Sequence, residues 1–173
     1  MQQSREVFLI STSLTARSGA LAVNGTMQAM RRPEPEPRLA YRHFVRLTTR
    51  WMDNDIYGHL NNVVYYSLFD TAVNQTLIAA GVLDIHHGQV IGLVVETHCS
   101  YFAPLAYPQV VEAGVRVAHL GRSSVRYEIG LFGEGEALCA AHGHLVHVYV
   151  DRQTRRPVPL PDPFKNFLQG LHP

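Results

Sequence analysis

A chain of 173 residues, of which 46% are hydrophobic and 17% are charged, has the composition of one globular domain with a substantial core. Its net charge of +1, without a long basic run, excludes the positive field that attracts nucleic acid. No apolar stretch approaches the roughly 20 residues that span a bilayer, so we expect no membrane partner. Cys99 and Cys139 lack a Cys-x-x-Cys spacing and are expected to be reduced core residues, which fits a cytoplasmic protein.

The first 40 residues differ in composition from the rest of the chain. They are rich in Ser, Thr, Ala and Gly, and they end in the proline-rich run 33–37. We expect a disordered N-terminal extension over residues 1–40, or an over-long translation start with Met27 or Met30 as the true first residue. The alternative is an organellar transit peptide, because the segment contains serine and arginine and few acidic residues.

The next elements are a strand and a helix. Residues 41–50 alternate between apolar and polar positions, which predicts a strand. From residue 64 the apolar side chains recur in pairs four positions apart, which predicts one amphipathic helix over residues 62–80. Gly81 stands where a left-handed C-cap would end it. The pairs are Val64/Tyr65, Leu68/Phe69, Ala72/Val73 and Thr76/Leu77.

Four further strands follow without a helix between them. They are predicted over residues 89–102, 110–120, 123–132 and 137–150, and the C-terminal tail 163–173 has room for one short helix. Strands joined in this way pair antiparallel, and one largely apolar helix needs a sheet face to cover it. We therefore predict an α+β domain over residues 41–162, with an antiparallel sheet of about five strands wrapped round one long helix. The exposed edge of such a sheet predicts a homo-oligomer.

The connection between the first strand and the helix is the part of the chain richest in reactive groups. It holds two carboxylates, a glycine, a histidine and two carboxamides: Asp53, Asp55, Gly58, His59, Asn61 and Asn62. Asn61 or Asn62 is a natural N-cap. The helix start offers backbone N–H groups and a partial positive charge, which suit a developing oxyanion.

This motif resembles a known signature. Asp-x-Asp-x-x-Gly-His-x-Asn-Asn, followed by Val-Val-Tyr-Tyr-x-x-Phe, is similar to the active-site motif of hotdog-fold acyl-CoA thioesterases of the 4-hydroxybenzoyl-CoA thioesterase type. Weaker strings follow in the expected order and extend the resemblance over residues 41–162: Phe102-x-Pro104-Leu105, Leu120 to Val125, and Val148-x-Val150-Asp151. The resemblance implies a hotdog fold, an acyl-CoA substrate, no metal or other cofactor, and active sites at the interfaces of a homodimer or homotetramer.

The resemblance places the catalytic carboxylate at Asp55. This group could attack a thioester carbonyl as a nucleophile or activate water as a general base, and the sequence leaves both routes open. Asp53 then becomes a turn-forming or supporting residue, unless the two roles are exchanged. Gly58 would let the backbone approach the thioester, and His59 would hydrogen-bond the carboxylate or the acyl carbonyl. A plain turn glycine and a structural loop histidine are the alternatives.

Three groups of residues are candidates for substrate binding. Asn61 and Asn62 are expected to cap the helix first and to contact substrate second. Tyr65, Tyr66 and Phe69 are candidates for the acyl pocket, although aromatic residues at helical spacing also form cores. Arg122, Ser123 and Ser124 form a turn that could bind the phosphates of coenzyme A, or simply lie at the surface. Asp70 falls on the polar face of the helix and is expected to be solvated.

The leading hypothesis is therefore an acyl-CoA thioesterase that releases a carboxylic acid and coenzyme A. One alternative is a non-catalytic hotdog module that only binds acyl-CoA. A second is an enoyl-CoA hydratase, whose branch of the fold typically carries Asp-x-Asn-Pro-x-His. This chain has a different spacing and no proline between Asp55 and His59.

Overall fold

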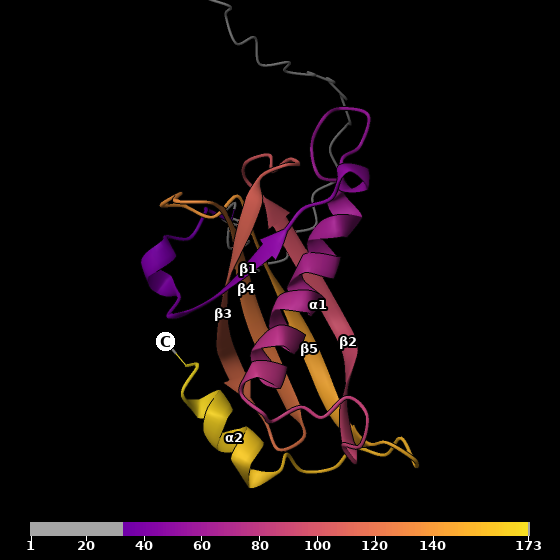
Figure 1. Ribbon diagram of the computed structural model, residues 1–173. Coiled ribbons are helices and arrows are strands. Elements are labelled where there is room, and N and C mark those ends of the chain that lie inside the picture. Colours follow the sequence, from indigo (N-terminus) through magenta and orange to yellow (C-terminus); the bar gives the residue numbers. More distant parts are fainter. Residues whose placement is uncertain (1–32, 173) are drawn as a thin grey trace, which may run out of the picture. The chain divides into compact units, whose positions relative to one another are not determined.

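The computed structural model describes residues 33–172, and the expectations for residues 1–32, including a start at Met27 or Met30, lie outside this range. Within it, five strands form one antiparallel sheet in the order β1-β3-β4-β5-β2 (Figure 1). The strands are β1 His43–Thr48, β2 Val90–Tyr101, β3 Val110–Leu120, β4 Ser124–Gly133 and β5 Ala141–Asp151. No helix of the described part is long and apolar enough to cross a membrane.

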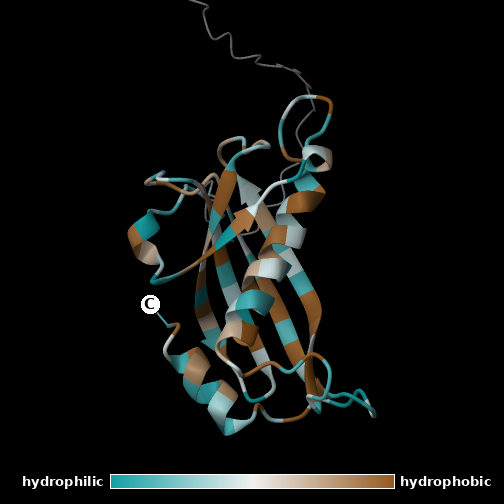
Figure 2. Ribbon diagram, viewed as in Figure 1, coloured by the Kyte–Doolittle hydropathy of each residue, from teal (hydrophilic) through white to brown (hydrophobic). Residues whose placement is uncertain are grey.

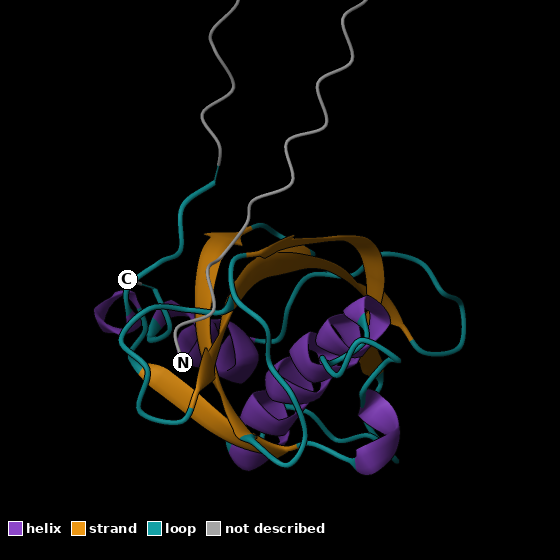
Figure 3. Ribbon diagram, turned by 90° about the horizontal axis from the view of Figure 1, so that it is seen from above, coloured by secondary structure: helices purple, strands orange, loops and turns teal. Residues whose placement is uncertain are grey.

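One long helix, α1 (Asn62–Ala79), covers one face of the sheet. Seen from above the view of Figure 1, the sheet curls round this helix (Figure 3). The alternating strand residues point their apolar side chains at α1, and the hydropathy colours show the same alternation (Figure 2). The helix ends as predicted, since Gly81 follows the last turn with φ of 68°. The predicted α+β architecture is confirmed.

The contact between α1 and β5 depends on a glycine. Phe69 is completely buried in the middle of the helix, and its ring lies directly over Gly143 of β5. A Cβ at position 143 would overlap both that ring and the backbone oxygen of His98. The missing side chain therefore lets the helix sit close enough to the sheet for Phe69 to fill the core.

The packed structure begins before residue 41. Arg38 donates its N–H to the Ala137 carbonyl at 2.8 Å, and Cys139 donates to the Glu36 carbonyl at 3.0 Å. These bonds draw residues 137–139 away from β4, which is why β5 starts at Ala141 and not at the predicted residue 137.

The outer face of the sheet carries a second, smaller apolar cluster. Tyr41, Phe44, Phe132 and Cys139 form it, and the Arg116 guanidinium lies 4.8 Å from the centre of the Tyr41 ring. Both cysteines are buried, as expected of core residues, and neither is in a disulfide in the described part of the chain.

Short helices complete the described part. They are η1 (Arg38–Ala40), η2 (Trp51–Asp53) and α2 (Asp162–Gln169). The last one lies in the tail, where a short helix was expected. Phe164 and Leu168 of α2 are buried, and the Phe164 ring lies 4.8 Å from that of Tyr149. This helix therefore adds apolar residues to the core beside β5.

Strand β2 is the long edge of the sheet. Its middle section is exposed, and Leu93, Val94 and Val95 are among the large apolar residues open to solvent. The strand also bulges, because the pairing with β5 shifts between Val94 and Glu96. An exposed apolar edge of this kind is a surface that other chains can pair with.

Replacing Phe69 with alanine should lower the free energy of unfolding by about 3–5 kcal/mol, because it empties the space over Gly143. Urea denaturation followed by circular dichroism measures this. Val63→Ala, at an exposed position of the same helix, should change the free energy by less than about 0.5 kcal/mol. A Phe69→Ala loss as small as that of Val63→Ala would contradict the core role.

Candidate active site

The loop before α1 begins with a buried carboxylate. Asp53 is only 4% exposed, and its oxygens accept hydrogen bonds from the Arg50 backbone N–H at 2.7 Å and from the Arg50 guanidinium at 2.9 Å. Arg50 precedes the short helix η2 and Asp53 is its last residue, so these bonds join the two ends of the helix. Asp53 is thus fully engaged in holding the loop, and it does not line the cavity that contains Asp55.

Backbone hydrogen bonds then tie the loop to the start of the helix. The Asn61 N–H donates to the Asp53 carbonyl at 2.8 Å, and the Leu60 N–H donates to the Leu105 carbonyl at 2.7 Å. Between them the chain makes a tight turn in which the Gly58 N–H bonds the Asp55 carbonyl. Gly58 has φ of 82°, a conformation that a residue with a side chain adopts only with strain.

The backbone N–H groups of the first turn of α1 differ in whether they have an acceptor. The Asn61 side chain accepts the Val63 N–H at 3.1 Å, and the Asn61 carbonyl accepts the Val64 N–H at 2.9 Å. Asn61 is therefore the N-cap, and these two amides are occupied. The Asn62 N–H, at the first helical position, has no acceptor within residues 33–172. It is the donor of this helix start that remains available to a ligand.

Asp55 and Asn62 line the same cavity, whose volume is about 440 Å³. The Asp55 carboxylate is half-buried, and its Oδ1 accepts the Tyr57 N–H at 2.8 Å and the His59 N–H at 3.4 Å. In the described structure Oδ2 has no hydrogen-bond partner. His59 also lines the cavity. The arrangement offers a carboxylate oxygen and a helix N–H to one bound molecule.

Two tyrosines form the aromatic wall of this cavity. The Tyr101 hydroxyl donates to the Asn62 carbonyl at 3.2 Å, and the two rings of Tyr65 and Tyr101 meet edge to face at 5.0 Å. Burial raises the pKa of both phenols above its usual value, so both stay neutral. Sequence reasoning missed Tyr101, as well as the remaining wall residues Leu60, Phe102, Ala103 and Pro104. The Phe102-x-Pro104-Leu105 string was the available signal.

Several predicted site residues lie elsewhere in the chain. Phe69 is in the core, and Tyr66 packs against it at 6.2 Å between ring centres, so neither lines this cavity. Arg122 and Ser123 lie in the turn between β3 and β4, and Ser124 is the first residue of β4. The start of β3 lies near the Asp55 loop, because the segment just before it contains Leu105, whose carbonyl accepts the Leu60 N–H. The turn follows the end of β3, so it lies at the opposite end of the sheet from Asp55.

One cluster in the described part has metal-ligand chemistry, on the outer face of the sheet. Oxygens of Glu36 and Glu128 and a nitrogen of His142 lie within 4.8 Å of one another. The Arg116 guanidinium pairs with both carboxylates, at 2.8 and 2.6 Å. The Arg116 guanidinium already supplies a positive charge beside the two carboxylates. These residues therefore fit an internal ion-pair network better than a metal centre.

Comparison with known proteins adds the family. The sequence profile of the thioesterase-like superfamily matches residues 49–168. Among curated proteins no match was found. The PA5185 protein of Pseudomonas aeruginosa PAO1 shares 54% identity, covers 80% of this chain and 97% of its own, and superposes with a TM-score of 0.79.

Two further solved structures are related more distantly. A Thermus thermophilus thioesterase, solved with coenzyme A and zinc, shares 30% identity over 76% of this chain and 95% of its own, with a TM-score of 0.63. A 1,4-dihydroxy-2-naphthoyl-CoA thioesterase from Synechocystis shares 17% identity over 75% of this chain and 98% of its own, with a TM-score of 0.67, and this likeness shows the fold alone. The motif, the fold and the profile match together show that the chain belongs to the thioesterase-like superfamily and has the hotdog fold.

Proposed function

We propose that the protein hydrolyses an acyl-CoA thioester to a carboxylic acid and coenzyme A, with Asp55 as its catalytic carboxylate. The observation that carries this proposal is the shared cavity of Asp55 and the unpaired Asn62 N–H. Thioester hydrolysis needs a base or nucleophile on one side of the carbonyl and a donor for the oxyanion on the other. The solved relative that holds coenzyme A at 30% identity supports the same substrate class.

The chemistry then runs through two atoms of this chain. In the general-base route, Asp55 Oδ2 takes a proton from water, the hydroxide adds to the carbonyl carbon, and the Asn62 N–H stabilises the oxyanion. The C–S bond breaks, and the thiolate takes the proton back from Asp55. In the nucleophilic route, Asp55 itself adds to the carbonyl and the C–S bond breaks to release the thiolate. Water then hydrolyses the mixed anhydride to the carboxylic acid product and the Asp55 carboxylate, and the second proton of that water passes to the thiolate. The bonds to Oδ1 hold the carboxylate in place for either route.

A second copy of the chain completes this proposal. The loop beside Asp55 exposes large apolar side chains, with Trp51 83% and Ile56 92% exposed, and the β2 edge adds Val95 at 61%. Such surfaces are normally covered in the working assembly. Arg122, Ser123 and Ser124 lie too far from Asp55 in one chain, so their contact with coenzyme A phosphates would come from the neighbouring copy.

A binding module without hydrolysis is the second candidate function. The observation in its favour is that Asp55 makes a loop turn like that of Asp84, whose Oδ1 accepts the His86 and His87 N–H groups at 2.9 Å. A carboxylate can therefore serve a turn alone. The two functions differ in whether thiol is released from bound acyl-CoA.

Replacing Asp55 with asparagine should lower kcat for acyl-CoA hydrolysis by at least about 100-fold, because asparagine keeps the turn but cannot take a proton. Thiol release with a thiol-reactive dye measures kcat across short, long and aromatic acyl-CoAs. Asp84→Asn, in the similar turn, is the matched control and should leave kcat unchanged. Equal turnover in both variants would rule out Asp55. Binding without thiol release in the unaltered protein would favour the binding module.

Asp53→Ala should lower the free energy of unfolding by about 1–3 kcal/mol, because it leaves the buried bonds to Arg50 unmade. Asp55→Ala should cost less than about 1 kcal/mol, since that carboxylate is half-exposed. Urea titration of the two variants measures this difference. The opposite order would mean that the two aspartates have exchanged roles.

Val95→Asp should convert the homo-oligomer into single chains, because a charge in the middle of the β2 edge opposes strand pairing. Size-exclusion chromatography with light scattering measures the mass. Leu39→Asp, at an apolar position that is 95% exposed but outside β2, should keep the assembly. A monomeric unaltered protein, or an intact assembly in Val95→Asp, would contradict the proposed interface.

A further inference from the structure

The phenol of Tyr65 is a buried group of the Asp55 cavity that no step of the proposed hydrolysis uses. The side chain is only 3% exposed, and it lines the cavity together with Asp55 and Asn62. Its oxygen accepts the Leu105 N–H at 3.4 Å. Its own O–H has no acceptor within residues 33–172. A hydrogen-bond donor is therefore free in the same space as the Asp55 carboxylate and the Asn62 N–H.

The helix directs this phenol towards its own N-terminus. Asn62 is the first residue of α1 and Tyr65 lies three positions later, so the two residues share one side of the helix. Helical side chains also lean back towards the N-terminus. The bond with Leu105 agrees with this direction, because the Leu105 carbonyl accepts the N–H of Leu60, just before the helix. The phenol and the Asn62 N–H can therefore reach one bound atom from two directions.

The surroundings keep this phenol protonated and favour it as a donor. Burial raises the pKa of Tyr65 above its usual value, and the negative charge of Asp55 acts in the same direction. The O–H is therefore present at neutral pH. The Leu105 N–H donates to the phenol oxygen, and hydrogen bonds linked in this way polarise one another. Tyr65 thus offers the cavity a neutral, polarised O–H.

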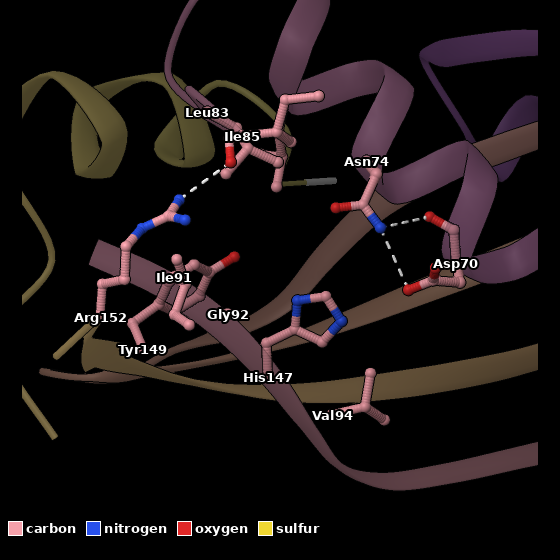
Figure 4. A pocket seen from close by; sticks show the side chains of 11 residues that line it. Asp70, Asn74, Leu83, Ile85, Ile91, Gly92, Val94, His147, Tyr149 and Arg152 are labelled. Atoms are coloured by element: carbon pink, nitrogen blue, oxygen red, sulfur yellow. Dashed lines mark hydrogen bonds between the residues drawn. The ribbon is translucent and has the colours of Figure 1, made fainter. Parts of the chain in front are cut away.

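A second cavity of the molecule shows the contrast. It lies between α1, β2 and β5 and has a volume of about 240 Å³ (Figure 4). Tyr149 lines it, but the Tyr149 hydroxyl is bonded to that of Tyr127 at 2.7 Å. His147 also lines this second cavity, and its Nε2 is buried without a partner. Neither Asp55 nor Asn62 contributes to its wall. The unpaired phenol O–H of Tyr65, by contrast, lies in the cavity that holds both of those groups.

We propose that the Tyr65 O–H is a second donor to the oxyanion, beside the Asn62 N–H. This inference rests on the proposed hydrolysis at Asp55 and adds a catalytic residue to it. Oxyanion sites commonly aim several donors at one oxygen, and the described helix start leaves one backbone donor free. The phenol donates to the acyl carbonyl oxygen, and this bond strengthens as negative charge develops there. Tyr65 keeps its proton, so the proton transfers of both routes are unchanged.

Tyr65→Phe removes the O–H and keeps the ring. It should lower kcat for acyl-CoA hydrolysis by about 100-fold, as the loss of one oxyanion donor does. KM should change by less than about twofold, because the bond strengthens only in the transition state. Tyr41→Phe is the matched control, since Tyr41 is equally buried but lies on the outer face of the sheet, and both constants should stay unchanged. An unchanged kcat in Tyr65→Phe, or an effect confined to KM, would overturn the proposal.

Infrared spectroscopy tests the hydrogen bond apart from turnover. The probe is an acyl-CoA analogue with a methylene in place of the thioester sulfur and a ¹³C label at the ketone carbonyl, whose stretching frequency falls with each hydrogen bond it accepts. Bound to Tyr65→Phe, this carbonyl should absorb at a higher frequency than in the unaltered protein or in Tyr41→Phe. Equal frequencies in all three would overturn the proposal, even if kcat falls. A frequency shift without thiol release from acyl-CoA would instead contradict the hydrolysis and support the bond from Tyr65 to the carbonyl.

Discussion

The hydrogen bond from the Asn61 N–H to the Asp53 carbonyl, 2.8 Å long, is the constraint on which the site depends. It joins the loop to the first turn of α1, and Asp53 in turn is held by Arg50. With both ends fixed, the turn at Gly58 has to place the Asp55 carboxylate beside the helix start. Asn61 occupies the amides of Val63 and Val64, which leaves the Asn62 N–H as the donor for a ligand. One local hydrogen bond therefore helps to position both the Asp55 carboxylate and the Asn62 N–H on which the proposed chemistry depends.

The helix that carries this donor is positioned by the sheet. Phe69 over Gly143 brings α1 close to β5, and β2 lies along the side of the helix (Figure 1). Both cavities result from that arrangement. One opens at the N-terminus of α1 beside Tyr101, and the other lies further along the helix beside His147. The helix thus supplies polar groups to the walls of both cavities, while its apolar side chains hold the core.

Much of the fold follows from local patterns. The apolar pairs from Val64 to Leu77 define a helix because burial of one face repeats every turn, and hairpins join β3 to β4 and β4 to β5. The expectation that hairpins join all four later strands is wrong for β2, which pairs with β5 and not with the next strand, β3. Features that depend on contacts between residues far apart in the sequence could not be predicted from these local patterns. Tyr101 reaches the site through a bond to Asn62, 39 residues earlier, and β5 starts late because residues 137–139 pair with the segment at Glu36 to Arg38. The unpaired Nε2 of His147 is likewise a product of packing, which spacing cannot indicate.

The most direct measurement of the central claim is the structure of the full chain with a non-hydrolysable acyl-CoA, in which a methylene replaces the thioester sulfur. We expect the ketone carbon about 3–3.5 Å from an Asp55 oxygen, or one bridging water away, with the ketone oxygen towards the Asn62 N–H. A carbonyl bound far from both groups, with Asp55 turned into bulk water, would contradict it.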